Sequence, residues 1–181
     1  MAQSGRPKKV DPKVDNLRHN ISQRDFETAK RTLQEFGINV QDGDGRTALI
    51  NSVIENQIEF VKWLVDNGAD INIQDRGGYS ALHFIGQDRL TEIGKFIISK
   101  RPNLELRDNY GNTPLWTAVM NSRQSLSLVK LFLDNSANVD NVNNAGRTPG
   151  QMIKTIYGDS FEKEIMRYDL KKFTMTKSKM K

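Results

Sequence analysis

One turn-like sequence recurs along the chain at a nearly constant spacing. Residues 42–49 read DGDGRTAL, and the pattern returns at 75–82 as DRGGYSAL and at 108–115 as DNYGNTPL. A weaker fourth copy, NNAGRTP, occupies residues 143–149. The shared glycines are at positions 45, 78, 111 and 146, so they are spaced 33, 33 and 35 residues apart. A period of this length indicates an array of repeated structural units rather than a single non-repeating core.

A second pattern follows the same period. Residues 63–72 read WLVDNGADIN, a looser copy occupies 96–105, and LFLDNSANVD occupies 131–140, two residues later than a strict period would put it. The two extra residues must lie between the two anchors of that unit. We therefore predict an insertion within residues 121–126, between two helices.

The residue types in each unit predict two short helices that follow a turn. Asp and Gly favour tight turns, and the Thr or Ser two residues after the Gly can cap the first helix. Pro114 and Pro149 directly follow this Thr, at a first helical position where a missing N–H costs nothing. Phe60, Val61 and Leu64 give the second helix an apolar face, and Gly68 is expected to end it. Neither helix can bury its face alone, so the units must stack.

These two anchors resemble the ankyrin-repeat family, whose unit begins Asp-x-x-Gly-x-Thr-Pro-Leu-His and ends Gly-Ala-Asp-x-Asn. The resemblance covers about residues 22–170. It implies an all-α solenoid of stacked helix-turn-helix units with β-turn fingers, about five units including caps. The repeat domain is expected over 12–170, with units at about 12–41, 42–74, 75–107, 108–142 and 143–170. Residues 1–11 and 171–181 are then basic tails, and the second is predicted to be disordered.

The end units are expected to differ from the inner ones. Residues 22–26, SQRDF, resemble a capping box that opens a helix reaching about Phe36, and 12–20 are expected to form the preceding helix. Gly150 replaces the family's Leu, which predicts irregular packing in the fourth copy. A closing helix is expected to use the apolar face of Phe161, Ile165, Met166 and Tyr168.

Charge and composition narrow the classes of function. The chain has no cysteine, and the basic start leads into no apolar segment, so we expect a protein of the cytoplasm, with the nucleus as an alternative. No apolar run approaches the length of a membrane span, so no membrane partner is expected. The net charge of +5 comes from the tails, whereas residues 21–160 contain fifteen basic and seventeen acidic residues. This distribution argues against nucleic acid as the partner of the repeats.

No residue pattern points to catalysis or to a cofactor. Residues 43–48 fit Gly-x-Gly-x-x-Ala, but they recur as a turn and lack the preceding strand of a dinucleotide fold. A calcium loop starting at Asp42 would need Glu at position 53, which is Val53. His83 occupies the family's Thr-Pro-Leu-His position, where the resemblance implies a structural role. We therefore expect no enzyme activity, cofactor, metal or small-molecule substrate.

The resemblance implies that a protein partner is bound by the turn tips and the exposed face of the first helices. We expect a monomer that acts as an adaptor or inhibitor through this concave face, or as an immunity protein that neutralises a toxin. The alternative is a nuclear or nucleic-acid-associated regulator that uses the basic tails. The candidate partner-binding residues are Arg46, Arg76, Tyr79, Asp88, Asn109, Tyr110, Asn112, Trp116, Met120 and Arg147.

Overall fold

A computed structural model describes residues 10–122 and 125–158 of the chain. Within these residues the regular structure is helical, and isolated β-bridges join Gln41 to Thr47 and Gln74 to Ser80. The fold divides into two compact units, Met1–Ala81 and Leu82–Lys181. The helices are α1 Pro12–Asp15, α2 Leu17–Ser22, α3 Phe26–Phe36, α4 Ala48–Ile54, α5 Ile58–Asp66, α6 Ala81–Asp88, α7 Thr91–Ser99, α8 Pro114–Met120, α9 Ser127–Asp134 and α10 Pro149–Tyr157.

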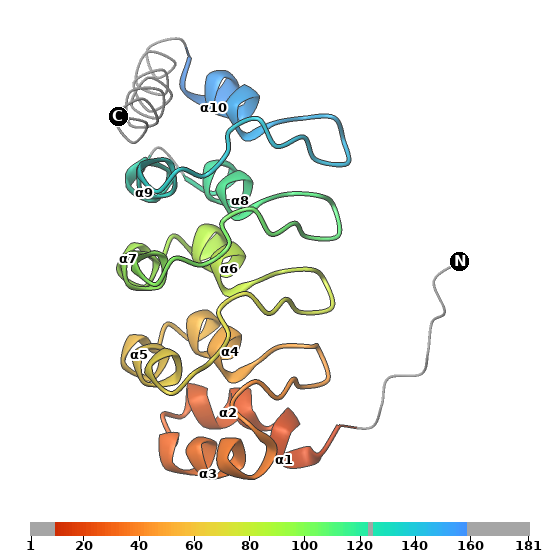
Figure 1. Ribbon diagram of the computed structural model, residues 1–181, viewed down its shortest axis with the longest axis vertical. Helices are drawn as coiled ribbons and strands as arrows, with labels where there is room; N and C mark the ends of the chain where they lie inside the picture. Colours follow the sequence, from red (N-terminus) through yellow and green to blue (C-terminus); the bar gives the residue numbers. More distant parts are fainter. Residues whose placement is uncertain (1–9, 123–124, 159–181) are drawn as a thin grey trace, which may run out of the picture. The chain divides into compact units, whose positions relative to one another are not determined.

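The first unit contains α1 to α5, the loop between α3 and α4, and the loop that follows α5. In this unit α2 packs against α3 and α4, and α4 packs against α5. Leu17, Ile50 and Leu64 are fully buried among these helices. The loop between α3 and α4 extends away from the helices as a finger (Figure 1). Helices pack in pairs behind a finger, as the repeat pattern predicts.

The second unit repeats this arrangement with nearly all of α6 and with α7 to α10. In it, α8 packs against α9 and α10, and α7 packs against α9. Leu82, Leu115 and Phe132 are fully buried, so the recurring leucine of the turn motif is a core residue. The fingers that precede α8 and α10 again extend away from their helices (Figure 1).

Capping side chains set the helix boundaries that the sequence predicts. The hydroxyl oxygens of Thr47, Thr113 and Thr148 accept hydrogen bonds from the backbone N–H groups that open α4, α8 and α10. Gly68 has a φ of +89° after α5, and its N–H donates to Val65 O while the next N–H donates to Leu64 O. This is the Schellman arrangement, which requires the left-handed conformation that glycine adopts easily.

The helices at the start of the first unit differ from two sequence predictions. Ser22 does not open a helix: it is the last residue of α2, and its hydroxyl donates to His19 O at 2.8 Å. Asp25 is the N-cap of α3 and accepts from the Thr28 N–H at 3.1 Å. Hydrogen bonding from Thr28 lowers the pKa of the Asp25 carboxyl. The expected helix over 12–20 is also divided in two, because the chain turns at Asn16.

The fourth copy forms a regular helix despite Gly150. The N–H of Gly150 donates to Val139 O at 2.9 Å, and a Cβ at this position would lie 3.3 Å from the same oxygen. The expected insertion does fall between two helices, since α8 ends at Met120 and α9 begins at Ser127. The closing helix expected around 161–168, the tail over 171–181 and most of the 1–11 tail lie outside the described residues. No helix in the described part of the chain has both the length and the apolar character needed to cross a membrane.

Candidate protein-binding surface

Each finger is built around the side chain of its first residue. Oδ1 of Asp42 accepts hydrogen bonds from the N–H groups of Asp44, at 3.0 Å, and Arg46, at 2.8 Å. The Asp42 N–H in turn donates to Arg46 O at 2.9 Å, which closes the turn. The same two-amide contact recurs at Asp75, Asp108 and Asn143. The carboxylate or carboxamide thus replaces water as the acceptor for the turn's backbone, which fixes the finger tip.

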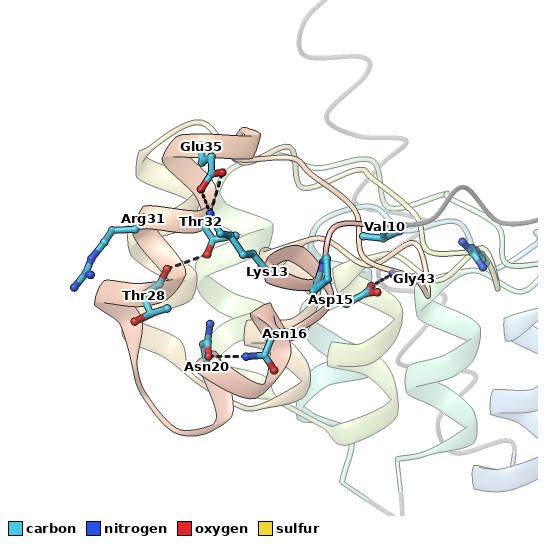
Figure 2. A pocket seen from close by; sticks show the side chains of 12 residues that line it. Val10, Lys13, Asp15, Asn16, Asn20, Thr28, Arg31, Thr32, Glu35 and Gly43 are labelled. Carbon is cyan, nitrogen blue, oxygen red and sulfur yellow. Dashed lines mark hydrogen bonds and ion pairs between the residues drawn. The ribbon is translucent and has the colours of Figure 1, made fainter.

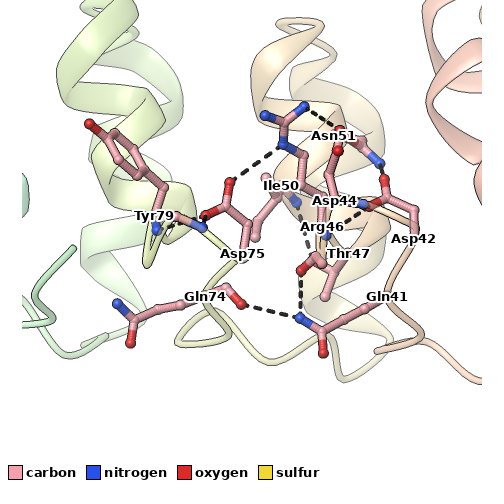
Figure 3. Close-up of polar contacts among 12 residues, drawn as sticks. Gln41, Asp42, Asp44, Arg46, Thr47, Ile50, Asn51, Gln74, Asp75 and Tyr79 are labelled. Atoms are coloured by element: carbon pink, nitrogen blue, oxygen red, sulfur yellow. Dashed lines mark hydrogen bonds and ion pairs between the residues drawn. The ribbon is translucent and has the colours of Figure 1, made fainter. Parts of the chain in front are cut away.

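In the first unit, hydrogen bonds join neighbouring fingers (Figure 3). Nε2 of Gln41 donates to Gln74 O at 3.1 Å, and the Arg76 N–H donates to Asp44 O at 3.0 Å. The Arg46 guanidinium lies between Asp44 Oδ2, at 3.3 Å, and Asp75 Oδ2, at 3.5 Å. Arg46 therefore already has two acidic contacts within its own chain.

In the second unit, corresponding contacts join the fingers that precede α8 and α10. The Asn144 N–H donates to Tyr110 O at 2.9 Å, and Asn143 Nδ2 donates to Asn112 Oδ1 at 2.8 Å. The Arg107 guanidinium donates to the carbonyls of Gly111 and Val142. These bonds hold the finger backbones at a fixed spacing, so exposed side chains between them are presented on a rigid frame.

His83 takes the structural role that the resemblance implies. Its side chain is fully buried in α6, and Nε2 lies 3.1 Å from the carbonyl oxygen of Asn112 in the next finger. Asn112 also donates from Nδ2 to Asp108 Oδ2 at 3.1 Å. Asn112, which the sequence suggests as a partner contact, is therefore a junction within the fold, engaged by His83, Asp108 and Asn143.

The large apolar side chains that are exposed among the described residues all belong to the second unit. Tyr110 is 69% exposed at a finger tip, Val142 is 50% exposed just before the next finger, and Met120 is 48% exposed at the end of α8. The fourth is Ile156 in α10. Trp116 is half-buried and lies one helical turn before Met120 on α8. Exposed side chains of this size, held on a rigid backbone, are typical of protein contact sites.

The other candidate residues divide between the two units. Arg76 is exposed and Tyr79 half-buried in the first unit, whereas Asp88, Asn109 and Arg147 are exposed in the second. Val142 and Arg107 were not among the candidates. A signal for both exists in the sequence, because they precede the finger's Asp or Asn by one position, as Gln41 and Gln74 do. Whether these residues contact a partner stays a prediction.

The described residues offer no alternative site for metal chemistry. No group of three or more His, Cys, Asp or Glu side chains within 10–122 and 125–158 could hold a metal ion. The acidic residues that begin the fingers are occupied by backbone N–H groups instead. Their recurrence is thus explained by turn formation.

Two family models match the chain. The model "Ankyrin repeats (3 copies)" covers residues 17–105, and "Ankyrin repeat" covers 110–144. Among curated relatives, the human Notch-regulated ankyrin repeat-containing protein is 42% identical over 66 residues, which span 36% of this chain and 58% of that protein. The putative ankyrin repeat protein FPV222 of fowlpox virus is 31% identical over 142 residues, 77% of this chain and 18% of that protein.

A putative ankyrin repeat protein of Rickettsia bellii is 32% identical over 109 residues, 57% of this chain and 31% of that protein. The chain thus spans little more than half the length of the Notch-regulated relatives and less of the others. The matched residues lie in the repeat region, and the fingers and paired helices of both units are the structure that ankyrin repeats form. Ankyrin repeats are protein-interaction modules without general catalytic activity, and this chain belongs to the ankyrin-repeat family.

Proposed function

We propose that the chain is a non-catalytic adaptor or inhibitor that binds a protein partner and occludes part of its surface. The contact would be made by the finger tips and the exposed face of the first helices, with the second unit contributing most of the binding energy. An immunity protein that neutralises a toxin, acting in the cytoplasm, is one form of this proposal. It rests on family analogy rather than on particular residues.

The observation that carries the proposal is the exposure of Tyr110 on a fixed frame. Its backbone N–H is bound by Asp108 and its carbonyl by Asn144, yet its side chain is 69% exposed. An aromatic ring costs little side-chain entropy to immobilise and offers a large contact area. A rigid finger therefore lowers the cost of ordering when a partner covers the ring.

The exposed side chains of this finger and of the end of α8 indicate the kind of contact. Asn109, Tyr110 and Met120 are uncharged, while the acidic Asp108 is buried under its own finger. Contact through these groups depends on apolar burial and hydrogen bonds rather than on long-range attraction. Binding is then expected to change little with ionic strength, whereas a nucleic-acid regulator would lose affinity steeply as salt rises.

The test is a paired affinity capture from the source cells. The wild-type chain and a Tyr110→Ala variant serve as matched baits, and retained proteins are compared at low and high salt. A protein retained by the wild type at both salt concentrations and lost by the variant supports the proposal. Retention of nucleic acid that disappears at high salt, equally with both baits, would favour the regulator that uses the basic tails instead.

A further inference from the structure

Asn67 is the only asparagine in the sequence that a glycine follows. The pair lies at the end of α5, where Asn67 is the C-cap and Gly68 has a φ of +89°. Both residues are exposed. Asparagine is chemically labile, because the next backbone nitrogen can attack its side-chain amide carbon and release ammonia. Glycine hinders this attack least, since it has no Cβ and the widest choice of backbone conformations.

The surroundings of Gly68 leave room for such a reaction. A Cβ built on Gly68 would meet no described atom within 4 Å beyond its chain neighbours. The preceding Asp66 is also exposed, so the end of the helix is open to solvent. Water, which the second step of the reaction consumes, therefore has access to this peptide bond.

Hydrogen bonds restrain the two reacting groups while the last turn of α5 is formed. Asn67 Nδ2 donates to Trp63 O at 2.7 Å, so the side-chain amide is held back against the helix. The Gly68 N–H donates to Val65 O at 3.1 Å. The attack requires both groups to leave the helix, so it must wait until this turn opens. Exposed turns at helix ends open at a low cost in free energy.

The asparagines of α1 and α2 lack this combination of features. Asn16 Nδ2 donates to Asn20 Oδ1 at 3.4 Å, and both side chains line a groove between α3 and the α1–α2 segment (Figure 2). Leu17 and Ile21, which follow them, are fully buried. Their branched side chains hinder attack by the backbone nitrogen, so these two amides are not expected to react.

We propose that Asn67 is a site of spontaneous deamidation whose rate is set by opening of the last turn of α5. The Gly68 nitrogen loses its proton and bonds to Asn67 Cγ, while the bond from Cγ to Nδ2 breaks and Nδ2 leaves with a proton as ammonia. Water then opens the resulting succinimide ring. Cleavage of the new bond gives aspartate, and cleavage of the bond from the Gly68 nitrogen to the main-chain carbonyl carbon gives isoaspartate. The inference does not depend on the proposed function.

Either product weakens the end of α5. A carboxylate at position 67 cannot donate to Trp63 O, and it adds negative charge at the negative end of the helix dipole. Isoaspartate adds a methylene group to the main chain just before Gly68 and Ala69, whose N–H groups close the turn on Val65 O and Leu64 O. Deamidation should therefore lower the stability of the first unit.

The second unit contains a matched control. Asn135 is the C-cap of α9, and its Nδ2 donates to Leu131 O at 2.9 Å, as Asn67 Nδ2 does to the corresponding carbonyl of α5. The next residue is Ser136, which has a φ of +70°. The two sites thus share their backbone turn and their side-chain hydrogen bond, and they differ in the residue that supplies the attacking nitrogen.

The test incubates the full chain in warm, mildly alkaline buffer and follows both amides by peptide mass spectrometry. Asn67 should lose its amide while Asn135 keeps it. Gly68→Ser, which copies the Asn135 turn, should slow the loss at Asn67 to the rate at Asn135. The same incubation in guanidinium chloride should speed the loss at Asn67, because the turn is then always open.

The proposal is overturned if Asn67 of the native chain loses its amide no faster than Asn135. It is also overturned if Gly68→Ser or denaturation leaves the rate at Asn67 unchanged, because the glycine or the opening of the turn would then not control the reaction. Urea denaturation tests the consequence: Asn67→Asp should lower the unfolding midpoint more than Asn67→Ala, which removes the same donor without adding charge. Equal midpoints for Asn67→Asp and the wild type would contradict the predicted loss of stability.

Discussion

Gly86 of α6 lies against the backbone of Ala118 in α8. A Cβ built on Gly86 would be 2.9 Å from the Ala118 nitrogen and 3.0 Å from the carbonyl oxygen of Pro114. Both atoms belong to a helix backbone, so neither can move without shifting α8. The absence of a side chain at this position is therefore what lets the first helices of adjacent repeats in the second unit approach so closely.

Gly86→Ala should destabilise the fold even though alanine favours a helix by about 1 kcal/mol over glycine. Overpacking against a fixed backbone costs about 1–3 kcal/mol, so the net free energy of unfolding should fall. Urea denaturation followed by circular dichroism measures the change.

Gly94→Ala in α7 is the matched control, because its Cβ would meet side-chain methyl groups of Leu128, Ile85 and Leu131, at 3.0, 3.1 and 3.5 Å, and no backbone atom is among these nearest neighbours. It should cost less than Gly86→Ala. An unfolding midpoint that rises for Gly86→Ala, as helix propensity alone requires, would show that the two helices are farther apart than described.

The first residue of each finger should tolerate a change of charge but not the loss of its side-chain oxygen. Asp108→Asn keeps the Oδ1 acceptor for the Tyr110 and Asn112 N–H groups, as Asn143 does in the next finger, and loses only the bond that Oδ2 accepts from Asn112 Nδ2, so it should cost less than the Ala variant. Asp108→Ala leaves both N–H groups without that acceptor and should cost about 1–3 kcal/mol. Equilibrium denaturation of the two variants compares them, and an equal loss for both would mean that the negative charge, not the hydrogen bonding, is what matters.

The recurring leucines of the turn motif should dominate the stability of the second unit. Leu82 and Leu115 are fully buried, so replacing either with Ala should lower the free energy of unfolding by about 2–5 kcal/mol. The exposed Met120 offers a comparison on the same helix as Leu115 and should cost less than about 1 kcal/mol when changed to Ala. A loss below about 0.5 kcal/mol at both leucines would contradict their place in the core.

Features fixed by local chemistry could be predicted from the sequence. The Thr47 and Thr113 caps and the left-handed Gly68 each depend on residues within one turn, and all three are confirmed. The cap of α3 was harder to predict, because Ser22 and Asp25 are both good N-cap residues three positions apart. The structure assigns the cap to Asp25, and buried Ile21 keeps the preceding residues in α2.

The position of the finger tips could be predicted from the sequence, but which of their side chains stay exposed could not. Tyr110 is exposed at its finger tip, as the motif suggests, whereas Arg46 and Asn112 bond to neighbouring fingers. These contacts join residues about one repeat apart, so they depend on how the fingers are aligned in space. Periodicity shows that the fingers recur, but it does not specify which side chains bridge them.

The most direct test of the proposed binding surface compares Tyr110 and Trp116 of the second unit with Trp63 of α5 in the first unit. Tyr110→Ala and Trp116→Ala should each weaken binding of the purified partner by more than about 1 kcal/mol, with little change in the thermal midpoint. Trp63→Ala should instead lower the thermal midpoint, because the Trp63 ring stacks on buried Phe60 with ring centroids 5.4 Å apart.

Isothermal titration calorimetry of the partner with each variant, beside a thermal melt of the same sample, is the deciding measurement. The account predicts lost affinity with an intact fold for Tyr110→Ala and Trp116→Ala. Normal affinity for both variants, together with loss of binding on changing the half-buried Lys62 of α5 in a chain that still melts normally, would place the partner on the second-helix side and contradict the account.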